Sequence, residues 1–362
     1  MRRGASQREI DDTIVWLGRR VLIISTKAIS PQLQAAAGHR LFPAFWALAA
    51  TGMRRSEQVQ PVAPRSGGCV TCLCRVAFWR MGGTIPVNGT ELFYESIGTG
   101  DPMVVLGGTA LGHSYLRPAM DRLADSFRVI YYDQRGSGNS PLGDAQRLSF
   151  DTAIADLAAL LDGLGLASAH MLGHSLGGDT VALFGSRHPD RVDALVIANP
   201  GPPFDPEGME ALESEMMGRR TPTDNEALDE IRASEAFQDL EPAGVEAFIR
   251  NIYQPFFLDR ANSDAAPYKF TANSAATVLD QESVLFQDFD REAAWSGLSN
   301  VKSRTLVVYA ELDPIPESFA RGLVEAIPGA QFQFLHGTNH FAFMETPDLF
   351  FPPVREFLRS GR

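Results

Sequence analysis

The sequence has little cysteine, no excess of positive charge and no apolar run long enough for a membrane span. Cysteine is confined to Cys69, Cys72 and Cys74, so the rest needs no oxidising compartment, which fits a cytoplasmic location. The net charge of −12 argues against a nucleic-acid partner, because neutralising phosphates requires a basic surface. The longest apolar run of the first eighty residues, 41–52, falls short of the roughly 20 residues of a membrane span. We therefore expect no stable membrane insertion.

Motifs for cofactors and metals are also missing. The chain has no P-loop, no complete dinucleotide-binding fingerprint and no H-E-x-x-H segment. Cys69, Cys72 and Cys74 have C-x-x-C-x-C spacing but lack the second ligand pair that a structural zinc site needs. The sequence therefore predicts neither a cofactor nor a metal.

Charge divides the chain into two parts. Residues 1–80 hold 12 Lys and Arg against 4 Asp and Glu, whereas the remaining residues hold 20 against 40. The first part also has no sustained hydrophobic period. We interpret 1–80 as an N-terminal extension: a mis-extended start, a disordered leader, or a targeting or anchoring segment.

Short apolar runs recur from residue 81 onward. Asn88-Gly89 between two strand-like runs predicts a β-hairpin. The later runs are apolar at successive positions and lack the alternation seen in half-exposed strands. This lack of alternation is typical of strands buried on both faces of a parallel sheet. The expected strands are 84–87, 91–94, 103–106, 128–132, 170–172, 192–198, 305–309 and 331–335.

Helical patterns separate these runs. Apolar residues at positions 154, 157, 161 and 164 recur at helical spacing, with Asp151 or Thr152 as the expected N-cap. Further helices are expected near 177–187, 317–327 and 351–359. Alternating strands and helices predict an α/β fold with right-handed crossovers.

Residues 204–300 interrupt this alternation. They contain 20 acidic and 7 basic residues, look helical, and are too long for a simple loop. We predict a helical cap over the carboxyl edge of the sheet, where open α/β folds bind ligands. A merely solvated acidic insert is the alternative. The core would then comprise residues 81–203 and 301–362.

One G-x-S-x-G motif has the context of a catalytic turn. Ser175, in Gly173-His174-Ser175-Leu176-Gly177, follows an apolar strand and begins a helix, as a nucleophile elbow requires. Ser114, in Gly112-His113-Ser114-Tyr115-Leu116, lacks the second glycine and a preceding strand. We therefore predict Ser175 as the nucleophile.

A serine nucleophile needs a base, and the base needs an orienting carboxylate. His340 follows the last expected strand, and Asp313 follows the strand before it, so both are expected at the edge that holds Ser175. Glu311 is the competing carboxylate but is expected to remain on its strand. His336 is expected to pack within the last strand, and the side chain of His174 should point away from the nucleophile.

The tetrahedral intermediate needs two backbone N–H donors. Leu176, directly after the nucleophile, supplies one. The loop Gly107-Gly108-Thr109 should supply the other, and we predict Gly108 because its missing side chain allows close approach.

These residues resemble the α/β-hydrolase superfamily, and in particular its proline iminopeptidase branch. Residues 132–140, Y-D-Q-R-G-S-G-N-S, are similar to that branch's D-Q-R-G-x-G-x-S turn, and Gly112–Leu116 resembles the segment before its first covering helix. The resemblance spans about 84–360. It implies a mostly parallel sheet of about eight strands flanked by helices, with a helical cap after strand 6. Two segments depart from the branch: Leu106–Ala110 replaces H-G-G-P-G, and His174 and Leu176 replace residues of G-G-S-W-G.

The leading functional hypothesis is a cofactor-independent serine hydrolase acting through Ser175, His340 and Asp313 on a small ester, lactone or amide. The alternatives are a proline iminopeptidase whose acidic cap binds a free amino group, a hydrolase of C–C bonds, and a non-catalytic ligand receptor on the same scaffold. The expected partner is a small molecule or short peptide.

Overall fold

The computed structural model describes residues 12–17, 20–25, 80–108, 111–143, 148–201, 206–285 and 289–360. The chain divides into two units, Met1–Arg75 and Val76–Arg362. In the first unit, strands β1 (Asp12–Leu17) and β2 (Arg20–Ser25) pair antiparallel. The segment 41–52 and the three cysteines lie outside the described residues, so their interpretation stays a prediction.

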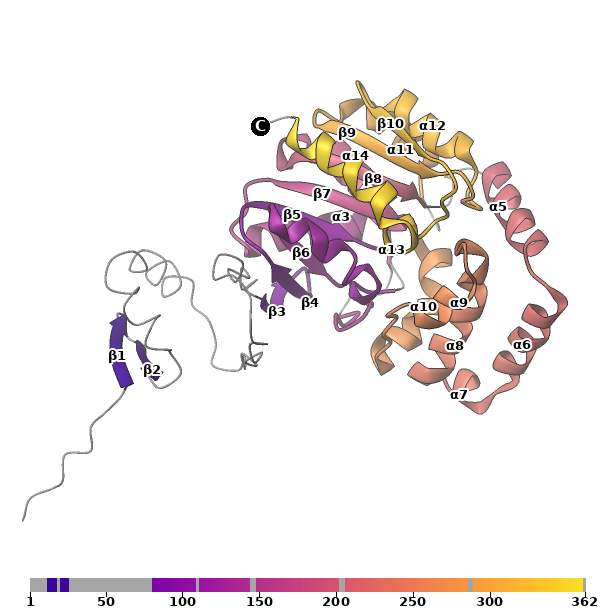
Figure 1. The fold of residues 1–362 in the computed structure, drawn as a ribbon, viewed down its shortest axis with the longest axis horizontal. Coiled ribbons are helices and arrows are strands. Elements are labelled where there is room, and N and C mark those ends of the chain that lie inside the picture. Colours follow the sequence, from indigo (N-terminus) through magenta and orange to yellow (C-terminus); the bar gives the residue numbers. More distant parts are fainter. Residues whose placement is uncertain are drawn as a thin grey trace, which may run out of the picture. The chain divides into compact units, whose positions relative to one another are not determined.

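The second unit is built on an eight-stranded sheet in the order β10-β9-β8-β7-β5-β6-β4-β3 (Figure 1). Strand β4 pairs antiparallel with both β3 and β6, and the other pairs are parallel. This confirms the predicted mostly parallel sheet. The strands are β3 (Arg80–Val87), β4 (Thr90–Ile97), β5 (Asp101–Leu106), β6 (Phe127–Tyr132), β7 (Ala169–Ser175), β8 (Val192–Pro200), β9 (Arg304–Ala310) and β10 (Gln331–Leu335).

Local sequence explains these strands. Asn88 and Gly89 have φ values of 32° and 77°, the left-handed pair that a tight hairpin turn between β3 and β4 requires. In β5, side chains on both faces are inaccessible to solvent, because the helices bury the sheet on each side. The predicted hairpin and the buried central strands are therefore confirmed.

Helices cover both faces of the sheet. One buried apolar cluster joins the sheet to α3, α4, α11 and α12, and a second joins its other face to η3, η4, α13, α14 and the cap. The N-cap of α3 is Ser149, not Asp151 or Thr152, because the Ser149 hydroxyl accepts the Thr152 N–H. The core helices are η3 (Ser114–Leu116), η4 (Met120–Asp125), α3 (Phe150–Gly163), α4 (Leu176–Arg187), η5 (Pro189–Arg191), α12 (Glu317–Ala326), α13 (Ala342–Glu345) and α14 (Pro347–Arg359).

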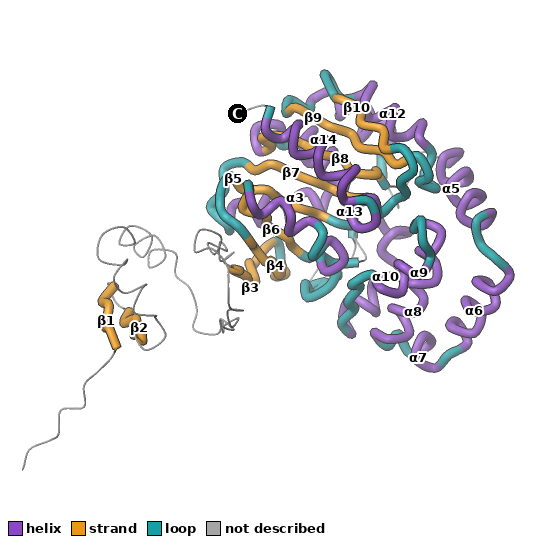
Figure 2. Tube along the Cα trace, viewed as in Figure 1, coloured by secondary structure: helices purple, strands orange, loops and turns teal. Residues whose placement is uncertain are grey.

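The segment between β8 and β9 consists of helices and loops where the structure describes it, after the sixth strand of the sheet (Figure 2). It begins at the carboxyl end of β8, so it lies at the sheet edge predicted for the cap. No helix in the described ranges is both long and apolar enough to cross a bilayer. The helices of this segment are α5 (Pro206–Gly218), α6 (Pro222–Ala233), α7 (Glu235–Gln238), α8 (Pro242–Tyr253), η6 (Gln254–Phe256), α9 (Ala261–Ala265), α10 (Ala272–Leu285), α11 (Arg291–Gly297) and η7 (Leu298–Asn300). The last two, α11 and η7, pack against α4 and belong to the apolar cluster on the other face of the sheet.

Candidate active site

Ser175 occupies a strained turn between β7 and α4. Its φ of 55° and ψ of −135° are unusual for a residue with a side chain. The neighbouring glycines leave no room for larger residues: a Cβ on Gly173 would lie 2.2 Å from the Gly177 carbonyl oxygen, and one on Gly177 would lie 2.5 Å from the Leu106 and Gly107 carbonyl oxygens. This geometry is that of a nucleophile elbow, which presents the hydroxyl at the carboxyl edge of the sheet.

His340 and Asp313 are brought together as a hydrogen-bonded pair. The Nδ1 atom of His340 lies 2.8 Å from Asp313 Oδ2, and both side chains are almost completely buried. The amide of Asn199 donates to Asp313 Oδ2 at 2.7 Å, and the backbone N–H of Ile315 donates to Oδ1 at 3.0 Å. The carboxylate is thereby held as an acceptor, which places the imidazole proton on Nδ1.

The other ring nitrogen of His340 is left as an acceptor. Nε2 is buried and has no hydrogen-bond partner among the described residues. A buried polar atom without a partner is unusual, and it is the state required of a base awaiting a proton. Asn199, at the end of β8, was missed at the sequence level, because an asparagine at a strand end has no distinguishing pattern.

The rival residues lie elsewhere. β9 ends at Ala310, so Glu311 is not on the strand; its carboxylate accepts the Gly337 N–H at 2.7 Å. The expectation for His336 is also wrong: β10 ends at Leu335, and the His336 side chain is 82% exposed. Gly337 turns the backbone with a φ of 66°, which ends the apolar strand before His336 can pack.

His174 is buried beside His340, with ring centroids 4.6 Å apart. Its Nδ1 lies 3.0 Å from the Tyr115 hydroxyl, and its Nε2 lies 3.0 Å from the His340 carbonyl oxygen. Burial holds the pKa of His174 well below its usual value, so the ring is neutral. Because a carbonyl only accepts, Nε2 carries the proton and Nδ1 accepts the Tyr115 O–H.

The two expected oxyanion donors have different surroundings. Leu176 is the first residue of α4, so its N–H has no acceptor within the helix. The Gly108 N–H donates to the Tyr115 hydroxyl at 2.9 Å. A Cβ on Gly108 would meet none of the described residues within 4 Å. Thr109 and Ala110 lie outside the described residues.

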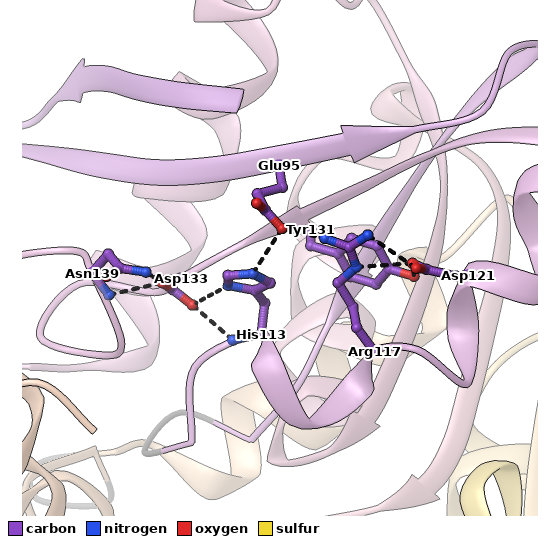
Figure 3. A network of polar contacts seen from close by, with 7 residues as sticks. All are labelled: Glu95, His113, Arg117, Asp121, Tyr131, Asp133 and Asn139. Carbon is purple, nitrogen blue, oxygen red and sulfur yellow. Dashed lines mark hydrogen bonds and ion pairs between the residues drawn. The ribbon is translucent and has the colours of Figure 1, made fainter. Parts of the chain in front are cut away.

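A polar network fixes the segment that follows this loop (Figure 3). The backbone N–H and Nδ1 of His113 each lie 2.7 Å from Asp133 Oδ1, and the Asn139 N–H donates to Asp133 Oδ2 at 2.8 Å. His113 Nε2 lies 3.3 Å from Glu95, which also pairs with Arg117. Ser114 begins η3 beside this network, and its buried hydroxyl has no partner among the described side chains.

The charges in this network reinforce one another. Burial alone would lower the pKa of His113, but the carboxylates of Asp133 and Glu95 outweigh it and raise the pKa to about 9. The hydrogen bond from His113, with the charge of Arg117, lowers the pKa of Glu95 to about 2 against the effect of burial. His113 is therefore a buried cation at neutral pH.

The Y-D-Q-R-G-S-G motif has a structural role in this chain. Asp133, Gln134 and Arg135 tie the turn after β6 to the segment Gly107–His113 and to α3. Gly138 is required because a Cβ there would lie 2.3 Å from Asp133 Oδ2. The bonds run from the His113 N–H to Asp133, from Gln134 Nε2 to the Gly107 carbonyl at 3.2 Å, and from Arg135 to both Asp156 oxygens at 2.9 and 2.8 Å.

The chain is similar to several known proteins. A protein of Synechocystis sp. named "Putative non-heme chloroperoxidase" is 28% identical over 284 residues, covering 74% of this chain and 95% of its own length. One of Azorhizobium caulinodans named "Putative carbamate hydrolase RutD" is 27% identical over 274 residues, covering 72% and 92%. The crystal structure of proline iminopeptidase from Mycobacterium smegmatis has a TM-score of 0.58 at 24% identity, covering 78% of this chain and 98% of that one. At that identity the likeness shows the fold alone.

The family model described as alpha/beta hydrolase fold matches residues 101–347. This match begins at β5 and includes the elbow, the cap and both loops that hold Asp313 and His340. Since it covers more than half of the sequence, the chain belongs to the α/β-hydrolase fold family.

Proposed function

We propose that this α/β hydrolase is a cofactor-independent serine hydrolase acting on a small ester, lactone or amide. One observation supports this most directly: His340 binds Asp313 through Nδ1 and keeps a buried Nε2 without a partner among the described residues. A base in this state can accept the proton of a serine hydroxyl. Ser175, on the strained elbow, is the proposed nucleophile.

The proposed reaction has two halves. The Ser175 oxygen attacks the substrate carbonyl carbon while its proton passes to His340 Nε2. The oxyanion is bound by the N–H groups of Leu176 and Gly108. Collapse of this intermediate breaks the bond to the leaving group, which takes the proton from His340. Water then attacks the acyl-serine, giving its proton to His340, and the acid leaves as Ser175 regains its proton.

An aminopeptidase is the alternative, and the described residues single out no carboxylate for it. A peptidase specific for N-terminal residues needs a carboxylate to bind the substrate's ammonium group. Among the described residues, the buried acids belong to the core and not to the cap: Asp133, Asp156, Asp179 and Asp313. The relative named as a carbamate hydrolase also fits hydrolysis at a small carbonyl. The cytoplasmic location expected from the sequence is part of this proposal.

The test is serine-dependent turnover by the full chain. We expect hydrolysis of p-nitrophenyl acetate, a loss of about 10³-fold or more in kcat for Ser175→Ala, and labelling of Ser175 by a fluorophosphonate. Ser114→Ala is the matched control, because Ser114 also follows a Gly-His pair, and it should retain activity. Prolyl-p-nitroanilide turnover would support the aminopeptidase. A folded protein inert to all three reagents would favour the receptor.

A further inference from the structure

The buried hydroxyl of Tyr115 connects two segments of the proposed site, the loop of Gly108 and the loop of His340. Its oxygen accepts the Gly108 N–H at 2.9 Å and lies 3.0 Å from His174 Nδ1. The other nitrogen of His174 lies 3.0 Å from the carbonyl oxygen of His340. A continuous chain of hydrogen bonds therefore joins the expected oxyanion loop to the backbone of the expected base.

The direction of every proton in this chain is fixed. The His340 carbonyl can only accept, so His174 donates from Nε2. The neutral ring then accepts at Nδ1, so Tyr115 donates there, and the tyrosine oxygen accepts from Gly108. Reversing any one bond would leave two donors or two acceptors facing each other. These hydrogen bonds consequently have a single arrangement, and they pass through His174, the residue directly before Ser175.

The contacts around the loop show what this chain supports. A Cβ on Gly107 would lie 2.6 Å from the Tyr115 hydroxyl and ring, so the loop is packed directly on the tyrosine. Gly108 faces open space in its Cβ direction. The loop is thus packed on Tyr115 on one side and has room at Gly108 on another side, among the described residues.

We propose that Tyr115 and His174 are positioning residues of the oxyanion site, which hold the Gly108 amide in place relative to His340. This inference rests on the proposed serine hydrolase function. A negatively charged oxyanion is a stronger acceptor than a phenol oxygen, so it can share the Gly108 N–H that Tyr115 holds. The neutral carbonyl of the substrate cannot compete as well. The effect should therefore be realised in the transition state and change kcat, not KM.

The aromatic cluster offers a matched control. Tyr268 packs against Tyr115 with ring centroids 6.2 Å apart, and it is also buried. Its hydroxyl, unlike that of Tyr115, has no hydrogen-bond partner among the described residues. Tyr115→Phe and Tyr268→Phe therefore each remove a phenol oxygen from the same aromatic cluster, but only Tyr115→Phe interrupts the series of hydrogen bonds.

The experiment compares both variants with the full-length wild type on p-nitrophenyl acetate and on a trifluoromethyl ketone, which forms an oxyanion on the serine. For Tyr115→Phe we expect kcat to fall about 10- to 100-fold, somewhat less than the loss of a whole oxyanion donor. KM should stay within about two-fold, and inhibition by the ketone should weaken in proportion to kcat. Tyr268→Phe should match the wild type.

A second pair of variants keeps the test decisive if Tyr115→Phe does not fold. His174→Gln retains one acceptor and one donor, and should keep more of the kcat and ketone affinity than His174→Leu. Equal losses in that pair, an unchanged or raised kcat in Tyr115→Phe, or a change confined to KM would overturn the inference. A wild type without Ser175-dependent turnover would instead overturn the proposed function itself.

Discussion

Asn199 donates a 2.7 Å hydrogen bond to Asp313 Oδ2, the same oxygen that lies 2.8 Å from His340 Nδ1. The two donors come from different strand ends and share one acceptor. Because Ile315 holds the other oxygen at 3.0 Å, the carboxylate has one orientation. Asn199 therefore restrains the carboxylate that binds His340.

Removing this restraint should slow turnover without abolishing it. In Asn199→Ala, Asp313 keeps its bond to His340 but loses one of its two other donors. We expect kcat to fall about 10-fold, since one hydrogen bond to a charged group is worth roughly 1.5–3 kcal/mol. Steady-state kinetics on p-nitrophenyl acetate would measure it. A variant as inactive as Ser175→Ala would mean that Asn199 itself takes part in the chemistry.

The assignment of Asp313 over Glu311 gives a second prediction. Asp313→Asn removes the charge that stabilises the imidazolium and should lower kcat by about 10³-fold or more. Glu311→Gln, two residues away, alters a carboxylate that binds only the Gly337 N–H and His336 among the described groups, and should retain nearly full kcat. The two variants would be compared at equal folded fraction, measured by circular dichroism. A larger loss in Glu311→Gln would reverse the assignment.

The assignment of Asp313 and the error over His336 illustrate what the sequence could and could not predict. The positions of the strands along the chain, and the expectation that Ser175, Asp313 and His340 lie at strand ends, follow from local signals: apolar runs, a glycine-flanked serine, and polar residues after strands. The end of β10 does not. Phe334 and Leu335 continue an apolar pattern into His336, and only the turn at Gly337 shows that the strand has already ended.

Contacts between segments far apart in the chain could not be predicted from local sequence patterns. Tyr115 and His174 are 59 residues apart, and His174 and His340 are 166 apart. Each segment by itself is compatible with many partners. The prediction that His174 points away from the nucleophile was based on the geometry of the elbow, but nothing local indicated that its ring would join the loop of Gly108 to the loop of His340.

The buried His113 network predicts a dependence of stability on pH. The pKa of His113 is raised from 6.5 to about 9, so its stabilising effect is complete below pH 6.5 and is lost as the pH rises through 9. The pKa of Glu95 is lowered from 4.5 to about 2, so its effect is complete above pH 4.5 and is lost as the pH falls toward 2. Stability from this network should therefore be greatest between about pH 4.5 and 6.5.

Thermal unfolding between pH 5 and 10 would measure the alkaline limb. The wild type should lose on the order of a few kcal/mol through the deprotonation of His113, since each pKa unit corresponds to about 1.4 kcal/mol. In His113→Gln, which cannot carry the charge, the melting temperature should be lower at pH 6 and should fall less toward pH 10. Parallel curves for the two proteins would show that His113 is not a cation in the folded state.

Two adjacent glycines should respond differently to alanine. A Cβ on Gly107 would lie 2.6 Å from the Tyr115 ring and hydroxyl, whereas one on Gly108 would meet none of the described residues within 4 Å. Gly107→Ala must displace the tyrosine, so we expect a destabilisation of about 1–3 kcal/mol and a reduced kcat. Gly108→Ala should change the free energy of unfolding by less than about 0.5 kcal/mol. Because its new methyl group enters the open space beside the expected oxyanion donor, it should raise KM most for esters with bulky acyl groups. Equal destabilisation of the two variants would contradict the packing of the loop on Tyr115.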